Sequence, residues 1–147
     1  MIEPSSGIIE GKTHLLAVRV YYEDTDFTGV VYHANYLRYF ERGRSDFLRV
    51  SGVSHSALLD REDPSAFAIT QMTIGFKRAA RIDDALTVRT QYQTVKGVRL
   101  MFGQQIVRGP DLIATAQVEA VCITPDGKPR RPPRDLVERL KPLFTLS

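Results

Sequence analysis

The sequence has only one cysteine, no long apolar run and no marked excess of charge of either sign. The single cysteine, Cys122, cannot form an internal disulfide, which favours a reducing cytoplasm. No spacing of cysteine and histidine resembles a metal site. No stretch approaches the ~20 apolar residues that a helix needs to cross a bilayer. We therefore expect a cytoplasmic protein that has no membrane span and no metal.

The charge balance argues against a nucleic-acid partner. Lys and Arg total 20 against 17 for Asp and Glu, and the basic residues are dispersed without interleaved aromatic side chains. A mild basic excess of this kind suits a small anionic ligand. Residues 1–14 lack the pattern of a secretory signal and are expected to be flexible. The remaining composition, 43% hydrophobic over 147 residues without repeats, predicts one domain over residues 1–147.

One long amphipathic helix stands out in the first half of the chain. Apolar residues recur at spacings of four and three from Tyr36 to Val50, and no β-branched residue interrupts residues 34–48. Gly43, in the middle of this helix, costs ~1 kcal/mol relative to alanine, which indicates close approach of the sheet backbone; an ordinary surface glycine is the alternative. The apolar face of the helix needs such a sheet to cover it.

The other segments supply that sheet. β-branched and aromatic residues predict strands separated by short turns, so that neighbouring strands should be antiparallel. An edge strand with apolar alternation could also pair with a second subunit. The fold class is therefore α+β, with about five strands and one long helix. The expected strands cover residues 15–22, 66–76, 86–95, 98–107 and 112–123, and shorter helices are expected over residues 54–60 and 135–143.

Polar chemistry concentrates in residues 21–44, YYEDTDFTGVVYHANYLRYFERGR. Asn35 is a favoured N-cap type, so the first free N–H groups of the helix should lie between His33 and Leu37. These donors carry about half a positive charge and could polarise an acyl carbonyl. Asp26, seven residues upstream, could act as a nucleophile or as a base for a water molecule.

Plainer interpretations of the same residues stay open. Asp24 and Asp26 could be ordinary turn residues, and His33 could be a capping or core histidine. His55, a lone histidine in a serine-rich turn, is expected to be structural or exposed. Residue types and spacing alone therefore leave the function undecided.

Taken whole, residues 21–44 resemble the signature of hotdog-fold acyl-CoA thioesterases. The similarity is to the 4-hydroxybenzoyl-CoA thioesterase class, and within it to the subgroup associated with bacterial Tol-Pal operons. It extends over residues 18–131 and includes FKRAARIDDALTV and ATAQVEAVCITPDGKPRRPP. The resemblance implies a sheet curled around the long helix, hydrolysis of an acyl-CoA, and a homodimer commonly paired into a homotetramer. It implies no cofactor beyond the coenzyme A of the substrate.

The resemblance also assigns roles to individual residues. The aspartate matching Asp26 is the catalytic carboxylate, and the backbone N–H of the residue matching His33 faces the thioester carbonyl. Tyr22 matches a tyrosine that lines the same site. The other positions of the motif that we expect to contact substrate are Val30, Tyr32 and Asn35.

Two basic groups could bind the phosphates of coenzyme A, because guanidinium suits bidentate phosphate contacts. A solvated basic surface is the alternative for both groups. They consist of Lys77, Arg78 and Arg81, and of Lys128, Arg130 and Arg131.

Two other functions compete with thioester hydrolysis. A hotdog dehydratase would need an acid and a base around the α and β carbons of its substrate, whereas the motif is directed at a carbonyl. A catalytically silent acyl-CoA-binding module would not need both Asp26 and His33.

Overall fold

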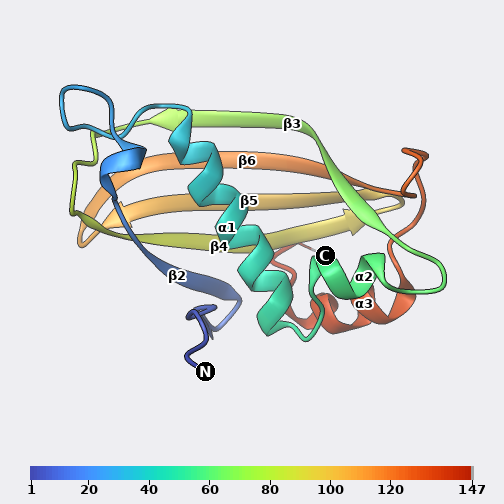
Figure 1. Cartoon of the computed structure of the whole chain (residues 1–147). Helices are drawn as coiled ribbons and strands as arrows, with labels where there is room; N and C mark the ends of the chain where they lie inside the picture. Colours follow the sequence, from blue (N-terminus) through green and yellow to red (C-terminus); the bar gives the residue numbers. More distant parts are fainter. Residues whose placement is uncertain (147) are drawn as a thin grey trace.

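The computed structural model describes residues 1–146 and shows an antiparallel sheet that curves around one long helix (Figure 1). The strand order is β1-β2-β4-β5-β6-β3. This confirms the expected α+β class, with six strands rather than about five. The strands are β1 (Ile8–Glu10), β2 (Thr13–Arg19), β3 (Ala66–Phe76), β4 (Ala85–Lys96), β5 (Arg99–Arg108) and β6 (Asp111–Ile123).

The N-terminal part differs from the expectation in two places. A strand lies inside the segment expected to be flexible, because β1 pairs with β2 in a hairpin. The strand expected over residues 15–22 ends at Arg19, and Tyr22–Asp24 form a 3-10 turn. The carboxylate of Asp24 accepts a hydrogen bond from the Tyr21 backbone N–H at 2.8 Å. This local side-chain bond competes with the strand ladder and ends it.

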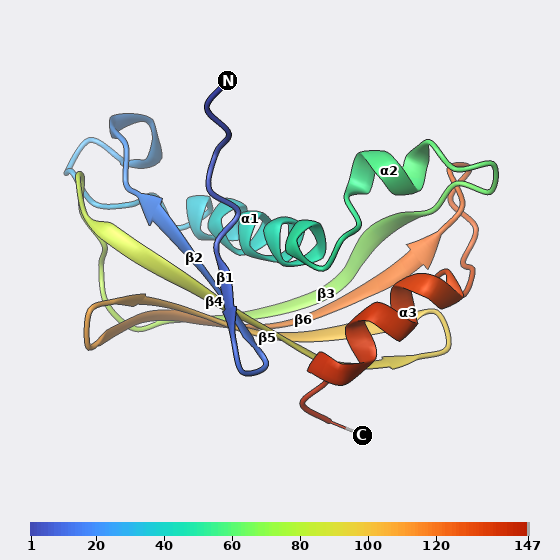
Figure 2. The same ribbon diagram turned by 90° about the horizontal axis from the view of Figure 1, so that it is seen from below.

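The long helix α1 (Asn35–Val50) lies on the concave side of the sheet (Figure 2). Its buried face, including Tyr36, Phe40 and Phe47, packs against sheet residues such as Val88 to form the core. The expected shorter helices are confirmed as α2 (His55–Leu59) and α3 (Arg134–Leu140). Within residues 1–146, no helix is both long enough and apolar enough to span a membrane.

Gly43 is a point of close contact between α1 and the sheet. A Cβ atom built there would lie 2.7 Å from Val88 Cγ1 and 2.8 Å from Thr90 Oγ1. Both distances are shorter than ordinary van der Waals contact. The helix and the sheet do approach closely here, but the nearest atoms belong to side chains of the sheet and not, as was expected, to its backbone.

Replacement of Gly43 by valine is expected to lower the free energy of unfolding by about 1–3 kcal/mol, because the core must move to admit the side chain. For a chain of this length, that corresponds to a fall in Tm of about 2–12 °C. Differential scanning calorimetry would measure it, with the exposed Arg42→Val as the matched helix variant. Equal Tm values for the two variants would contradict this packing.

Candidate active site

A tight loop connects β2 to α1 and carries Asp26. Thr25 and Val31 form an antiparallel bridge, and the Asp26 N–H donates to the Val30 carbonyl at 2.9 Å. Gly29, with a φ of 81°, allows the chain to reverse within this short span. Asp26 is thereby held in one arm of a small hairpin whose other arm leads directly into the start of α1.

The Asp26 carboxylate is held in its charged form. The Thr28 hydroxyl and the Thr28 backbone N–H both donate to its Oδ1, at 2.6 and 2.8 Å. These bonds, led by the one from the hydroxyl, and a further backbone contribution from Val30 lower the pKa of Asp26. The carboxylate is therefore ionised at neutral pH and available as a nucleophile or base.

The start of α1 leaves two backbone donors free. The amides of residues 35–37 each donate to the carbonyl three residues earlier. No hydrogen bond joins the amides of His33 and Ala34 to any acceptor in residues 1–146. Free N–H groups were expected over residues 33–37, but only those of His33 and Ala34 are free. The His33 N–H, which the resemblance places against the thioester carbonyl, is one of the two.

Asn35 does not cap the helix as expected. The N-cap position belongs to Ala34, and Asn35 is the first helical residue. Its side-chain amide instead donates to Asp24 Oδ1 at 3.0 Å, in a buried contact. Asp24 therefore bonds both the Tyr21 amide and the Asn35 side chain, which ties the loop to the helix start. A buried tertiary bond replaces the local capping bond.

Aromatic rings surround the helix start. The imidazole of His33 is exposed, lies 4.6 Å from the Tyr32 ring and faces the edge of Phe76 at 6.4 Å. Tyr36 also contacts the end of β3. Its ring lies 5.8 Å from the ring of Phe76, and its hydroxyl accepts a hydrogen bond from the Ala80 N–H. The end of β3 thus forms one wall beside the two free amides.

Several apolar side chains near this wall face solvent. Phe27 is fully exposed at the loop tip, and Tyr22 is 84% exposed on the 3-10 turn. In the single chain Tyr22 is not packed against Asp26 or His33, so its role in the site stays a prediction.

The two basic groups lie at opposite ends of the sheet. Val30 of the loop bridges to Arg81, which places Lys77, Arg78 and Arg81 beside the helix start. The group of residues 128–131 follows β6, whose last residue, Ile123, pairs with Ala66. Because Phe76 closes the other end of β3, about 30 Å of strand separates the groups within one chain.

Arg130 already has a partner. Its guanidinium forms a bidentate ion pair with Asp63 and also donates to the Pro64 carbonyl at 3.1 Å. These bonds fix the segment before β3 to the segment after β6. Arg130 therefore has a structural contact that the sequence did not indicate, whereas Lys128 and Arg131 are exposed.

The sequence also did not indicate a cavity under the second half of α1, which has a volume of about 120 Å³. Four helix residues at spacings of three, one and three line it: Glu41, Arg44, Ser45 and Leu48. They form a stripe beside the buried face of α1, and that mixed polar spacing is the signal that could have revealed it. His55 lines the same cavity. Within residues 1–146, no three His, Cys, Asp or Glu side chains lie together as a metal site would require.

The fold is an antiparallel sheet curved around one helix, and a short hairpin joins the Asp26 loop to the start of that helix. Residues 20–140 match the family model of the thioesterase-like superfamily, and the chain belongs to that superfamily.

Individual relatives agree with this assignment. The chain is 41% identical over 126 residues to an Escherichia coli protein named acyl-CoA thioester hydrolase YbgC, covering 84% of this chain and 92% of the relative. It is 42% identical over 106 residues to the Haemophilus influenzae acyl-CoA thioesterase YbgC, covering 72% and 77%.

Solved structures confirm the hotdog fold. A probable thioesterase from Bartonella henselae superposes with a TM-score of 0.80 at 44% identity, covering 82% of this chain and 99% of the other. A 1,4-dihydroxy-2-naphthoyl-CoA thioesterase from Synechocystis superposes with a TM-score of 0.80 at 25% identity, covering 88% and 96%.

Proposed function

We propose that the protein hydrolyses an acyl-CoA thioester to a free carboxylic acid and coenzyme A. The observation that carries the proposal is the hairpin that pairs the arm of the ionised Asp26 with the arm leading to the free amides of His33 and Ala34. Names of relatives at 41–42% identity support the same substrate class.

In this reaction the thioester carbonyl oxygen accepts hydrogen bonds from the His33 and Ala34 amides. Such donors, aimed at the developing oxyanion, stabilise the transition state by ~3 kcal/mol each. Asp26 either attacks the carbonyl carbon or deprotonates a water that attacks it. The first route expels the coenzyme A thiolate and forms a mixed anhydride, which water then cleaves. Both routes give the same products.

A homodimer formed through β3 supports this chemistry. β3 is an 11-residue edge strand, and two large apolar side chains on it, Ile69 and Phe76, are exposed. Symmetric antiparallel pairing of two β3 strands would set Ala66 of one subunit beside Phe76 of the other. The second basic group, with the partner's Lys128 and Arg131, would then lie at the same end as Lys77, Arg78 and Arg81. A monomer in light scattering at micromolar concentration would contradict this assembly, and pairing of dimers would give a tetramer.

The finer assignment follows the motif of residues 21–44. We place the protein in the 4-hydroxybenzoyl-CoA thioesterase class and its Tol-Pal-associated subgroup. Tyr22, Val30 and Tyr32 would line the bound substrate. A cytoplasmic location agrees with a single cysteine, Cys122, which is buried and unpaired.

Thiol release from a panel of acyl-CoAs, from short to long aliphatic plus aryl, tests the function. We expect release from at least one member, with matching formation of free acid. Coenzyme A binding without release from any substrate would favour the silent binding module. Hydration or dehydration of the acyl chain without release would favour the dehydratase.

A further inference from the structure

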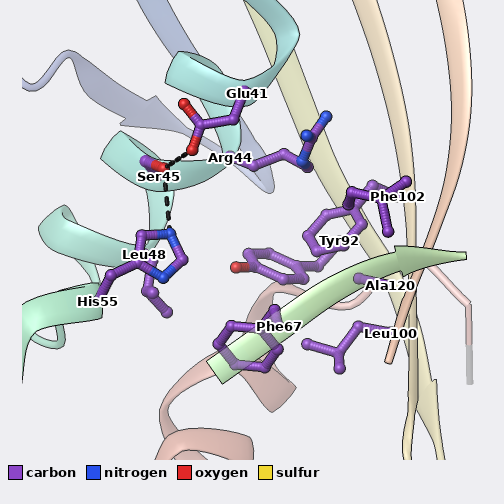
Figure 3. A pocket seen from close by; sticks show the side chains of 11 residues that line it. Glu41, Arg44, Ser45, Leu48, His55, Phe67, Tyr92, Leu100, Phe102 and Ala120 are labelled. Carbon is purple, nitrogen blue, oxygen red and sulfur yellow. Dashed lines mark hydrogen bonds between the residues drawn. The ribbon is translucent and has the colours of Figure 1, made fainter. Parts of the chain in front are cut away.

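The cavity lies between the second half of α1, His55 of α2 and the end of the sheet where β3 and β5 begin and β6 ends (Figure 3). Its floor is apolar and largely aromatic, whereas its opposite wall is polar. Its volume, about 120 Å³, is close to that of cavities that admit one benzene-sized group. The floor consists of sheet residues, namely Phe67, Ile69, Tyr92, Leu100, Phe102 and Ala120.

The polar wall is a chain of three hydrogen-bonded side chains. The Ser45 hydroxyl donates to Glu41 Oε1 at 2.6 Å, and His55 Nε2 lies 3.0 Å from the same hydroxyl oxygen. Because the single hydroxyl proton of Ser45 is donated to Glu41, the hydrogen bond between His55 and Ser45 must be donated by His55 Nε2. This is not the order of a nucleophilic triad, in which histidine accepts the serine proton. The Ser45 hydroxyl is therefore not activated as a nucleophile in this arrangement.

Tyr92 places an unused donor in the cavity. The side chain is 2% exposed, yet no hydrogen bond joins its hydroxyl to another residue in 1–146. In Figure 3 the hydroxyl points across the cavity toward Leu48 and His55. Burial raises the pKa of Tyr92, so the hydroxyl stays protonated and can donate. The hydroxyl opens onto the cavity, where an oxygen atom of a ligand could accept its hydrogen bond.

The surroundings hold Tyr92 in place. Its ring lies 4.7 Å from Phe47 and 4.6 Å from Phe102, which leaves little freedom to rotate away. The register of β4 shifts directly after Tyr92, and the register of β3 shifts directly after Ile69, which also lines the cavity. Such irregularities re-aim side chains and are frequent beside active sites.

We propose that this cavity binds the far end of a short acyl group that carries a hydroxyl or keto oxygen, with the Tyr92 hydroxyl as its hydrogen-bond donor. The inference rests on the proposed thioesterase function and on pairing through β3. Within one chain, Ser45 lies twelve residues after His33, about 18 Å along the helix. Antiparallel β3 pairing instead sets the partner's Phe67 close to Phe76, which contacts His33. The carbonyl at one subunit's helix start is thus within short reach of the partner's cavity.

Matched pairs of substrates test this inference, namely 4-hydroxybutanoyl-CoA against butanoyl-CoA and 4-hydroxybenzoyl-CoA against benzoyl-CoA. We expect Tyr92→Phe to lower kcat/KM about tenfold for the oxygen-bearing member of at least one pair and to leave the other member nearly unchanged. If only the butanoyl pair changes its ratio, the cavity binds an aliphatic acyl group; if only the benzoyl pair does, it binds an aryl group. Tyr39→Phe is the matched control, because its buried hydroxyl also has no partner but lies outside the cavity.

The outcomes separate this inference from the proposed function. If thiol is released but Tyr92→Phe leaves the ratio of kcat/KM between the two members of each substrate pair unchanged, the inference is wrong and the thioesterase function stands. If no substrate releases thiol, the proposed function fails, and calorimetric titration with p-cresol and toluene tests the cavity alone. Preference for p-cresol that is lost in Tyr92→Phe and kept in Tyr39→Phe would support the oxygen-binding site. Equal binding of the two probes would overturn it.

Discussion

Replacement of Asp26 by asparagine is expected to lower kcat for thioester hydrolysis by about 10²–10⁴-fold, with KM nearly unchanged. Asparagine has the same shape and can still accept the two Thr28 hydrogen bonds, so the loop should keep its conformation. It cannot act as a base or as an anionic nucleophile. Thiol release at saturating acyl-CoA measures the effect.

The pH profile gives a second readout of the same residue. Because the Thr28 bonds lower the pKa of Asp26, the carboxylate stays charged at pH values where an ordinary aspartate is already partly protonated. Activity that needs the charged form should therefore persist to unusually low pH and be lost as pH falls through the lowered pKa. Asp60→Asn, which changes an exposed aspartate beside α2, should leave rate and profile unaltered. Full activity in Asp26→Asn would remove Asp26 from the mechanism.

Removal of two basic side chains at the end of β3 should weaken recognition of coenzyme A. We expect the double variant Lys77→Ala and Arg78→Ala to raise KM for acyl-CoA by about 10²–10⁴-fold, since hydrogen bonds to charged groups contribute ~1.5–3 kcal/mol each and two such side chains are removed. The turnover of bound substrate should change little. Initial rates over a range of acyl-CoA concentrations measure KM.

A truncated substrate isolates the phosphate contribution. The N-acetylcysteamine thioester of the same acyl group lacks the nucleotide, so its KM should be equal in the wild type and the double variant. Lys12→Ala combined with Arg89→Ala removes the same charge from the β1–β2 turn and from β4, and should leave KM for acyl-CoA unchanged. An equal rise in KM for both thioesters would show that the double variant damages the fold or the acyl site instead.

The sequence predicts well those features that depend on neighbours along the chain. The period of the long helix and the close approach at Gly43 both follow from local spacing and from the cost of an internal glycine. The loop that holds Asp26 can be placed because polar turn residues stand between apolar elements. Local signals were sufficient for these elements.

Features that depend on distant partners could not be predicted in this way. The bond between Arg130 and Asp63 joins residues 67 positions apart, and no local pattern pairs them. Asn35 has the residue type of an N-cap, but its buried bond to Asp24 overrides that preference. In the sequence Tyr92 is an ordinary aromatic residue of a strand. Its position in the cavity depends on α1 and on the other strands, which are distant along the chain.

The double anchoring by Asp24 separates the loop into a fixed base and a replaceable tip. One carboxylate holds the Tyr21 amide and the Asn35 side chain, whereas Phe27 at the tip is fully exposed. Phe27 can therefore be exchanged without disturbing the bonds of Asp24 or the amides at the helix start, whereas its neighbour Thr28 cannot, because Thr28 holds the Asp26 carboxylate. A designer who alters this loop is free at Phe27, and that freedom ends at Thr28 and Asp24.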